Sequence, residues 1–176
     1  MFYKELVTDR LLLKNISMCD REFVFAHFSN NEINRYLFDA EPVTDYDGAD
    51  EIINSYLQPE PRPHHRWVLV KKSDGTKIGT CGFHNWDIAS NSCDIGYDLH
   101  PDFWGNGYML EALKSICAFA KSEMKIHYIN AVIYIDNAGS MKLAERLGFT
   151  FTGQMKDEIF RGQRYPHQVL TLDCTK

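Results

Sequence analysis

The stretch SCDIGYDLHPDFWGNGYMLEALKSICAFA, residues 92–120, joins a predicted strand to a predicted helix through a loop that contains two glycines. Residues 92–99 alternate polar and apolar side chains, which is typical of a strand with one buried face. Pro101 ends that strand. Beyond the loop, apolar side chains recur at helical spacing and predict an amphipathic helix. They are Met109, Leu113, Ile116, Cys117 and Ala120.

The loop between these elements has the features of an anion site. Backbone N–H groups at the start of a helix have no partner inside the helix, and the helix dipole is positive at that end. Gly105 and Gly107 would let the backbone approach an anion closely. Leu110 replaces the third glycine of a dinucleotide fingerprint, and no GK[ST] follows, so the loop is not a P-loop. A phosphate site and a plain strand-to-helix turn both remain open on these residues alone.

Turn and cap residues divide the rest of the chain into short strands and helices, which predicts a single domain over residues 1–176. Strands are expected at 10–15, 66–72, 77–86, 127–135, 150–160 and 168–173, and helices at 21–28, within 45–57 and within 136–149. In the last of these helices, Asn137 fits the N-cap and Gly148 the left-handed residue after the helix. Antiparallel strands come first and strand–helix alternation follows, which predicts an α+β domain on one central sheet.

Composition excludes several classes of protein. Hydrophobic residues make up 44% and charged residues 24%, so neither a disordered chain nor a fibre is expected. A net charge of -5 argues against nucleic acid as the main ligand. No apolar run approaches the roughly 20 residues of a membrane helix, and no export signal is visible, which favours the cytoplasm. Five cysteines without CxxC spacing indicate reduced thiols, and we expect no metal.

Four motifs give the chain a resemblance to a known family. They are CDIGYDLHPDFWGNGYMLEAL (93–113), NAGSMKLAERLGFTFTG (137–153), TDRLLLKN (8–15) and EIFRGQRYPHQVLTL (158–172). In this order and spacing they resemble the GNAT superfamily of acyl-CoA-dependent N-acetyltransferases, most closely its RimJ/RimL-like branch. The resemblance implies a GNAT-like fold, with a mixed, mostly antiparallel central sheet flanked by helices. It also implies an acetyl-CoA-binding core at about 92–149 and an acceptor-side lid at about 30–63.

The same resemblance implies roles for individual residues in binding the coenzyme. The backbone near Tyr97, Asp98 and Leu99 would bond to the pantetheine arm as an added strand would, and Asn137 would lie near that arm. A cation for the 3′-phosphate would come from Lys142, Arg146 or Lys114. The loop that would hold the pyrophosphate consists of Trp104, Gly105, Asn106, Gly107, Tyr108 and Met109.

Two positions depart from the pattern of the family. Asp102 stands where relatives usually have Gln or Arg, and we expect its carboxylate to face solvent. Ala144 stands where many relatives have a tyrosine that serves as general acid. Ser140 is present instead, as in the RimJ/RimL branch, and its helical spacing from Ala144 turns its hydroxyl inward. A catalytic role near the thiol and a role in capping the helix are both open for Ser140.

Amine acetylation also needs a base, because an alkylammonium must lose a proton before it attacks. Glu158 in the closing hairpin and Asp94 on the strand 92–99 are the candidates. Asp98 shares a face with Asp94 but is expected to lie too near the pantetheine. Tyr36 and Trp86 are the expected contacts of the acceptor.

These residues predict transfer of an acetyl group from acetyl-CoA to a primary amine, either a protein N-terminus or a small amine, by direct attack in a ternary complex. A non-catalytic acyl-CoA-binding module is the alternative. A structural domain whose loop holds another nucleotide is a third reading. Coenzyme binding without release of thiol would favour the second of these, and binding of ATP or NAD the third.

Overall fold

The computed structural model describes residues 3–60 and 62–176, and it contains one eight-stranded sheet with the order β1-β2-β3-β4-β5-β6-β8-β7. The strands are β1 (Leu6–Val7), β2 (Leu11–Asn15), β3 (His65–Lys71), β4 (Lys77–Asp87), β5 (Ser92–Leu99), β6 (Tyr128–Tyr134), β7 (Thr150–Phe160) and β8 (Gln163–Asp173). Only β5 and β6 pair in parallel, and the other neighbours are antiparallel. The predicted mixed, mostly antiparallel sheet of a single-domain GNAT-like fold is confirmed.

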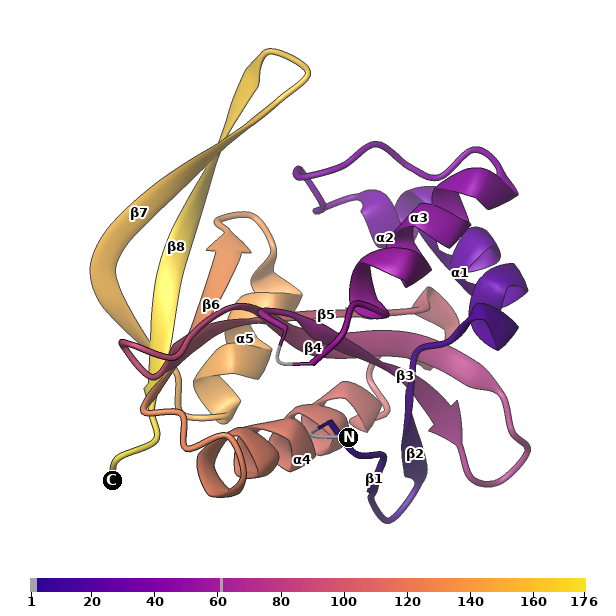
Figure 1. Ribbon diagram of the computed structural model, residues 1–176. Coiled ribbons are helices and arrows are strands. Elements are labelled where there is room, and N and C mark those ends of the chain that lie inside the picture. The colour runs from indigo at the N-terminus through magenta and orange to yellow at the C-terminus, as the bar shows by residue number, and fades with distance from the viewer. Residues whose placement is uncertain (1–2, 61) are drawn as a thin grey trace.

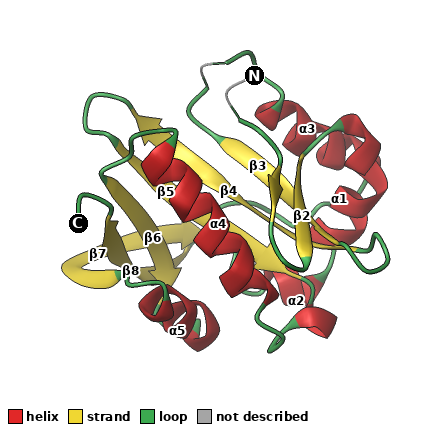
Figure 2. Cartoon of the chain, turned by 90° about the horizontal axis from the view of Figure 1, so that it is seen from below, coloured by secondary structure: helices red, strands yellow, loops and turns green. Residues whose placement is uncertain are grey.

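Helices cover both faces of this sheet. They are α1 (Arg21–Phe28), α2 (Asn31–Asn34), α3 (Tyr46–Tyr56), α4 (Tyr108–Ser122) and α5 (Ala138–Arg146), with short 3-10 turns at η1 (Met18–Asp20) and η2 (Pro101–Phe103). Figure 1 shows α1, α2 and α3 on one side of the strands and α4 on the other, and Figure 2 shows α4 lying across the sheet.

The side chains of strand β3 show why helices pack on both faces of the sheet. Trp67, Val68 and Leu69 are all fully buried although successive side chains of a strand point to opposite faces. Trp67 and Leu69 belong to the core beneath α4, whereas Val68 packs with α1 and α3. The two cores lie back to back, and the sheet between them is a rigid support for the loops at its edges.

The sheet separates in its middle, which is the feature that positions the site. Strands β5 and β6 pair only over Ser92–Asp94 and Tyr128–Asn130. From residue 95 to residue 99, β5 remains paired with β4 on one side, while no described strand pairs with its other edge. The chain therefore has a free strand edge that leads directly into the glycine loop.

Three elements differ from the expectations drawn from sequence, and the first is β1 (Leu6–Val7), which was not expected. Helix α2 lies where irregular chain was expected, and it begins where the Asn30 side chain accepts the Glu32 N–H at 2.8 Å. Strand β8 starts at Gln163 rather than at residue 168. Pro166 pairs with Asp157 of β7 and lies beyond the end of β6, where its carbonyl accepts the Ile135 N–H at 3.1 Å and its missing N–H is tolerated. In the described part of the chain, no helix is both long and apolar enough to cross a membrane.

Candidate active site

Helix α4 begins directly after the glycine loop, and its first backbone N–H groups have no hydrogen-bond acceptor within the helix. Gly105 and Gly107 have φ of +75° and +77°, in the left-handed region, so the backbone turns twice before α4. The first intrahelical bond runs from Glu111 N–H to the Gly107 carbonyl at 3.1 Å. The N–H groups of Tyr108, Met109 and Leu110 therefore have no acceptor within the helix, as in an anion-binding helix start.

Arg10 supports this loop from the N-terminal part of the chain. Its guanidinium donates to the Asn106 carbonyl at 2.9 Å and to the Glu111 carboxylate at 2.7 Å, and it lies over the Tyr108 ring at 4.4 Å. These contacts link β2 to the start of α4, so the loop is held in shape before any ligand arrives. Arg10 lies within the TDRLLLKN motif, which sequence reasoning noted without assigning it this contact.

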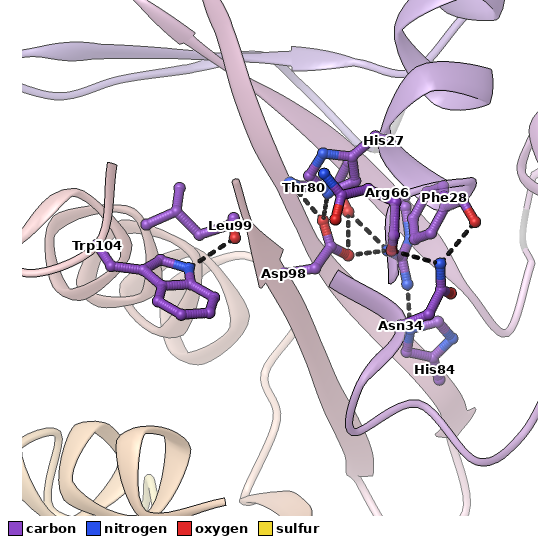
Figure 3. A network of polar contacts seen from close by, with 10 residues as sticks. His27, Phe28, Asn34, Arg66, Thr80, His84, Asp98, Leu99 and Trp104 are labelled. Atoms are coloured by element: carbon purple, nitrogen blue, oxygen red, sulfur yellow. Dashed lines mark hydrogen bonds and ion pairs between the residues drawn. The ribbon is translucent and has the colours of Figure 1, made fainter. Parts of the chain in front are cut away.

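Trp104 connects the loop to the end of β5. Its indole N–H donates to the Leu99 carbonyl at 2.7 Å, as Figure 3 shows. Since that carbonyl already has a donor, Leu99 offers less of its backbone to a ligand than the resemblance implies. Half of the Trp104 surface remains exposed. Asp102 has 79% of its side chain accessible, and the expectation that it faces solvent is confirmed.

A cavity of about 730 Å³ lies along the loop, the end of β5 and the start of α5. All of the predicted coenzyme contacts line it, from Tyr97 to Leu99, from Trp104 to Met109, and Asn137 with Ser140. Lys142 and Arg146 line it as well, and Lys114 is not among the described residues that do so. Arg35, directly after α2, is a third cation that lines this cavity, and the sequence did not point to it because α2 was not expected.

A second cavity, of about 460 Å³, lies on the other side of the separated strands. It contains both candidate bases, Asp94 and Glu158, together with Tyr36. The two cavities have six lining residues in common: Tyr36, Leu37, Tyr97, Asp98, Asn137 and Ser140. They therefore meet where β5 leaves β6.

Tyr97 and Ser140 are hydrogen-bonded to each other at that junction. The two hydroxyl oxygens are 2.7 Å apart. Asn137 Oδ1 accepts the Ser140 N–H at 3.1 Å, which confirms Asn137 as the N-cap of α5 and fixes Ser140 in the first turn. Burial raises the pKa of Tyr97 to about 12, although the hydrogen bond with Ser140 opposes this.

The two candidate bases have different surroundings. Glu158 on β7 pairs with Lys156 at 2.7 Å and keeps 30% of its side chain exposed. Asp94 on β5 accepts amide hydrogens from Asn85 at 2.8 Å and from Asn130 at 3.3 Å. Both side chains retain free lone pairs for an ammonium group or a water molecule.

Asp98 has a structural environment that separates it from both bases. Its carboxylate accepts hydrogen bonds from Thr80 Oγ1 at 2.7 Å and from Arg66 at 2.8 Å, and one oxygen lies 2.6 Å from His27 Nε2 (Figure 3). Only 7% of the side chain is exposed. Burial opposes ionisation, but His27 and Arg66 prevail and hold the pKa of Asp98 below its usual value. The carboxylate therefore anchors β5, and only the backbone of Asp98 is left to face a ligand.

Arg66 extends this network to the wall of the second cavity. It donates from Nη1 to Thr80 at 2.6 Å and from Nη2 to His84 Nε2 at 3.2 Å. Burial, followed by the charge of Arg66, lowers the pKa of His84 to about 3, so its imidazole stays neutral at physiological pH. Sequence reasoning did not single out Arg66 or His84; an arginine near the start of an otherwise apolar strand was the available signal.

Aromatic and charged side chains connect the segment between α2 and α3 to the β7–β8 hairpin beside the second cavity. Phe38 stacks on Tyr165 with ring centroids 3.8 Å apart. Beyond them, the Arg161 guanidinium contacts both oxygens of Glu41, with Nε to Oε1 at 2.9 Å. Figure 1 shows the chain between α2 and α3 approaching the tip of the β7–β8 hairpin.

Trp86 lies elsewhere in the molecule. It packs against the core beneath α4, with its ring 6.4 Å from that of Tyr3, and it is not among the described residues that line either cavity. The structure thus places Tyr36, Tyr97 and Ser140 at the junction and Asp94 and Glu158 in the second cavity, without Trp86.

Comparison with known proteins agrees with this geometry. A family model described as an acetyltransferase (GNAT) domain matches residues 10–150. The uncharacterized N-acetyltransferase YoaA of Bacillus subtilis is 31% identical over 170 residues, which is 95% of each chain. Among solved structures, RimL, a ribosomal alpha-N-protein acetyltransferase in complex with coenzyme A, superposes with a TM-score of 0.87 at 18% identity, over 97% of this chain and 98% of that one. Spermidine N-acetyltransferase from Vibrio cholerae, in complex with CoA and spermine, gives a TM-score of 0.83 at 18% identity, over 95% and 97%.

The fold, together with the matching family model, is that of an acyl-transferring α+β enzyme. The chain belongs to the GNAT acetyltransferase family and is a GNAT-type N-acetyltransferase.

Proposed function

We propose that this enzyme moves an acetyl group from acetyl-CoA to a primary amine by direct attack in a ternary complex, and that it belongs to the RimJ/RimL-like branch. The observation that carries the proposal is the junction of two cavities at Tyr97 and Ser140. One cavity has the donors and length for a nucleotide-bearing thioester, and the other contains carboxylates suited to an amine. The six lining residues that the two cavities share support a ternary complex, in which the amine attacks the thioester directly without a covalent enzyme intermediate.

The coenzyme would lie in the larger cavity. Its pyrophosphate would accept from the N–H groups at the start of α4, and its pantetheine arm would run along the free edge of β5 between residues 95 and 99. Lys142, Arg146 and Arg35 are the cations available for the 3′-phosphate. The segment 92–149 would then be the coenzyme-binding core and the segment 30–63 the acceptor-side lid.

The amine would enter through the smaller cavity. Alkylamines are mostly protonated at neutral pH, since their reference pKa is about 10.4. Glu158 or Asp94 would take that proton, directly or through one water molecule. Tyr36 is the aromatic contact that supports this placement, because it lines both cavities.

Chemistry at the thioester then requires alignment and stabilisation of charge. The amine nitrogen bonds to the carbonyl carbon, the carbon–sulfur bond breaks, and negative charge passes to the sulfur. Ser140 is the hydroxyl closest to the junction from the α5 side, and it would donate to that sulfur. Its helix-capping partner is Asn137, so its own hydroxyl is not needed as a cap.

Release of free thiol tests the proposal. Wild-type protein is incubated with acetyl-CoA and a panel of diamines, polyamines, amino sugars and peptides with free N-termini. The proposal predicts thiol release with at least one of these amines, in step with its acetylation seen by mass spectrometry. Bound coenzyme without thiol release for any amine would contradict it and favour a non-catalytic acyl-CoA-binding module.

A further inference from the structure

The Tyr97–Ser140 contact joins two elements that do not pair with each other in the sheet. Tyr97 comes from the free part of β5, and Ser140 comes from the first turn of α5. Their hydroxyl oxygens are 2.7 Å apart, and the Tyr97 hydroxyl makes a second, longer contact of 3.5 Å with the Ser140 carbonyl, which is much the weaker of the two. Both residues line both cavities.

A serine hydroxyl alone is a poorly directed donor. It rotates freely, and in the first turn of a helix it readily bonds to nearby backbone. Among the described residues, Tyr97 is the one hydrogen-bond partner of the Ser140 hydroxyl, so the direction of the Ser140 O–H bond depends on Tyr97.

The phenol of Tyr97 is suited to be the donor of this pair. Burial is the largest influence on it and raises its pKa to about 12, so the phenol keeps its hydrogen at neutral pH. When Tyr97 donates to Ser140 Oγ, the Ser140 hydrogen cannot point back to Tyr97. It turns toward the junction of the cavities, and donation in series strengthens the second hydrogen bond.

We propose that Tyr97 is a positioning residue that donates its hydroxyl hydrogen to Ser140 Oγ and so directs the Ser140 hydrogen at the coenzyme sulfur as the carbon–sulfur bond breaks. This inference rests on the proposed function. The nitrogen–carbon bond forms, the electron pair of the carbon–sulfur bond goes to sulfur, and the proton lost by the amine passes through the base and solvent to yield the thiol. Complete transfer from Tyr97 is not needed, since a thiol with a pKa of about 8.5 is a far stronger acid than this phenol.

The test compares leaving groups that depend differently on a hydrogen bond. Single-turnover rates of wild type and Tyr97→Phe are measured with acetyl-CoA and with its selenoester analogue, whose selenolate is a weaker base than the thiolate. We expect Tyr97→Phe to slow the thioester about tenfold, the loss of roughly one good hydrogen bond, and the selenoester less than twofold. The dissociation constant of coenzyme A should not change. Equal losses with both substrates would overturn the inference, because a purely structural role does not distinguish sulfur from selenium.

A double-mutant cycle provides a second readout. On a Ser140→Ala background, Tyr97→Phe should slow the thioester by less than twofold, since Tyr97 acts through Ser140. Full additivity would overturn the inference. Tyr128→Phe, which removes an exposed hydroxyl from β6, is the matched control and should match wild type. A wild-type enzyme that acetylates no amine contradicts the proposed function instead, so the two failures are distinguishable.

Discussion

Arg66 donates from Nη2 to Nε2 of His84 across 3.2 Å, and the same guanidinium donates to Asp98 across 2.8 Å. Arginine has no acceptor, so His84 Nε2 must be unprotonated and the imidazole must carry its hydrogen on Nδ1. His65 is held in the same way, because its Nδ1 accepts from Arg62 at 2.7 Å. His65 is buried and His84 is partly buried, and both are neutral because burial first, and the facing arginine second, disfavours the imidazolium form.

Stability should fall in mild acid as a consequence. Burial lowers the pKa of both His65 and His84 to about 3, whereas an unfolded histidine titrates near 6.5. Between these values the unfolded chain binds more protons, so the free energy of unfolding rises with pH and is lost as pH drops. Each histidine should cost about 2 kcal/mol on going from pH 7 to pH 5. Urea unfolding at the two pH values measures this.

The matched variant is His84→Gln, which keeps an acceptor for Arg66 but does not titrate. It should lose about 2 kcal/mol less than wild type between pH 7 and pH 5. His127→Gln, at an exposed position, should follow wild type. Identical pH dependence of wild type and His84→Gln would show that His84 is not held neutral.

The Asp98 carboxylate should be needed for the fold itself. Asp98→Asn leaves Arg66 buried without its anion, and removing one partner of a buried pair costs about 3–5 kcal/mol. Asp157→Asn, on β7 with a partly exposed side chain that pairs with Arg164 at 3.2 Å, is the control and should change the free energy of unfolding by less than about 0.5 kcal/mol. Similar values for the two variants in denaturant titrations would contradict the anchoring role of Asp98.

The alkaline limb of the pH–rate profile should depend on Glu158. If this carboxylate accepts the proton of the ammonium, Glu158→Gln should lower kcat/KM by about 10²-fold and flatten the rise of rate with pH. Asp157→Asn, next in sequence but on the opposite face of β7, should preserve the wild-type profile. A profile identical to wild type for Glu158→Gln would remove Glu158 as the base, and Asp94→Asn is then the variant to measure.

Substitution of Gly107 tests whether the glycine loop binds coenzyme A, and Gly75, which has nearly the same φ, provides the control. At a φ of +77°, Gly107→Val strains the backbone by about 1–2 kcal/mol or more and moves the first N–H groups of α4. We expect the dissociation constant of coenzyme A to rise at least tenfold. Gly75→Val has the same strain at a φ of +76° in the turn between β3 and β4, so it should lower stability and leave coenzyme affinity unchanged. Calorimetric titration with coenzyme A measures the dissociation constant of each variant. Equal affinities for the two variants would contradict binding of coenzyme A by the glycine loop.

Much of this fold follows from local pattern. Strands β5 and β7 begin and end at the residues that alternation and turn signals predict, and α5 is bounded by Asn137 and Gly148 as expected. Helix α2 was missed because four residues carry too little periodicity to be recognised. The start of β8 was misplaced because Pro166 is excluded only from strands that pair on both sides.

In the candidate site, too, some features can be predicted from local sequence and others depend on the tertiary structure. The glycine loop can be predicted because a helix start, its donors and its glycines are contiguous in sequence. The partnership of Arg66 with Asp98 depends on the pairing of Thr80 with Asp98, which no local signal contains. Trp86 was expected to contact the acceptor. Its packing against Tyr3 depends on the tertiary fold, which no local sequence pattern reveals.

The most direct test is a crystal structure of this enzyme with coenzyme A bound. We predict the pyrophosphate oxygens at hydrogen-bonding distance, about 3 Å, from the backbone N–H groups between Trp104 and Met109. We also predict the pantetheine along the free edge of β5 and the sulfur beside Ser140. A coenzyme bound elsewhere while this loop stays empty would contradict the account.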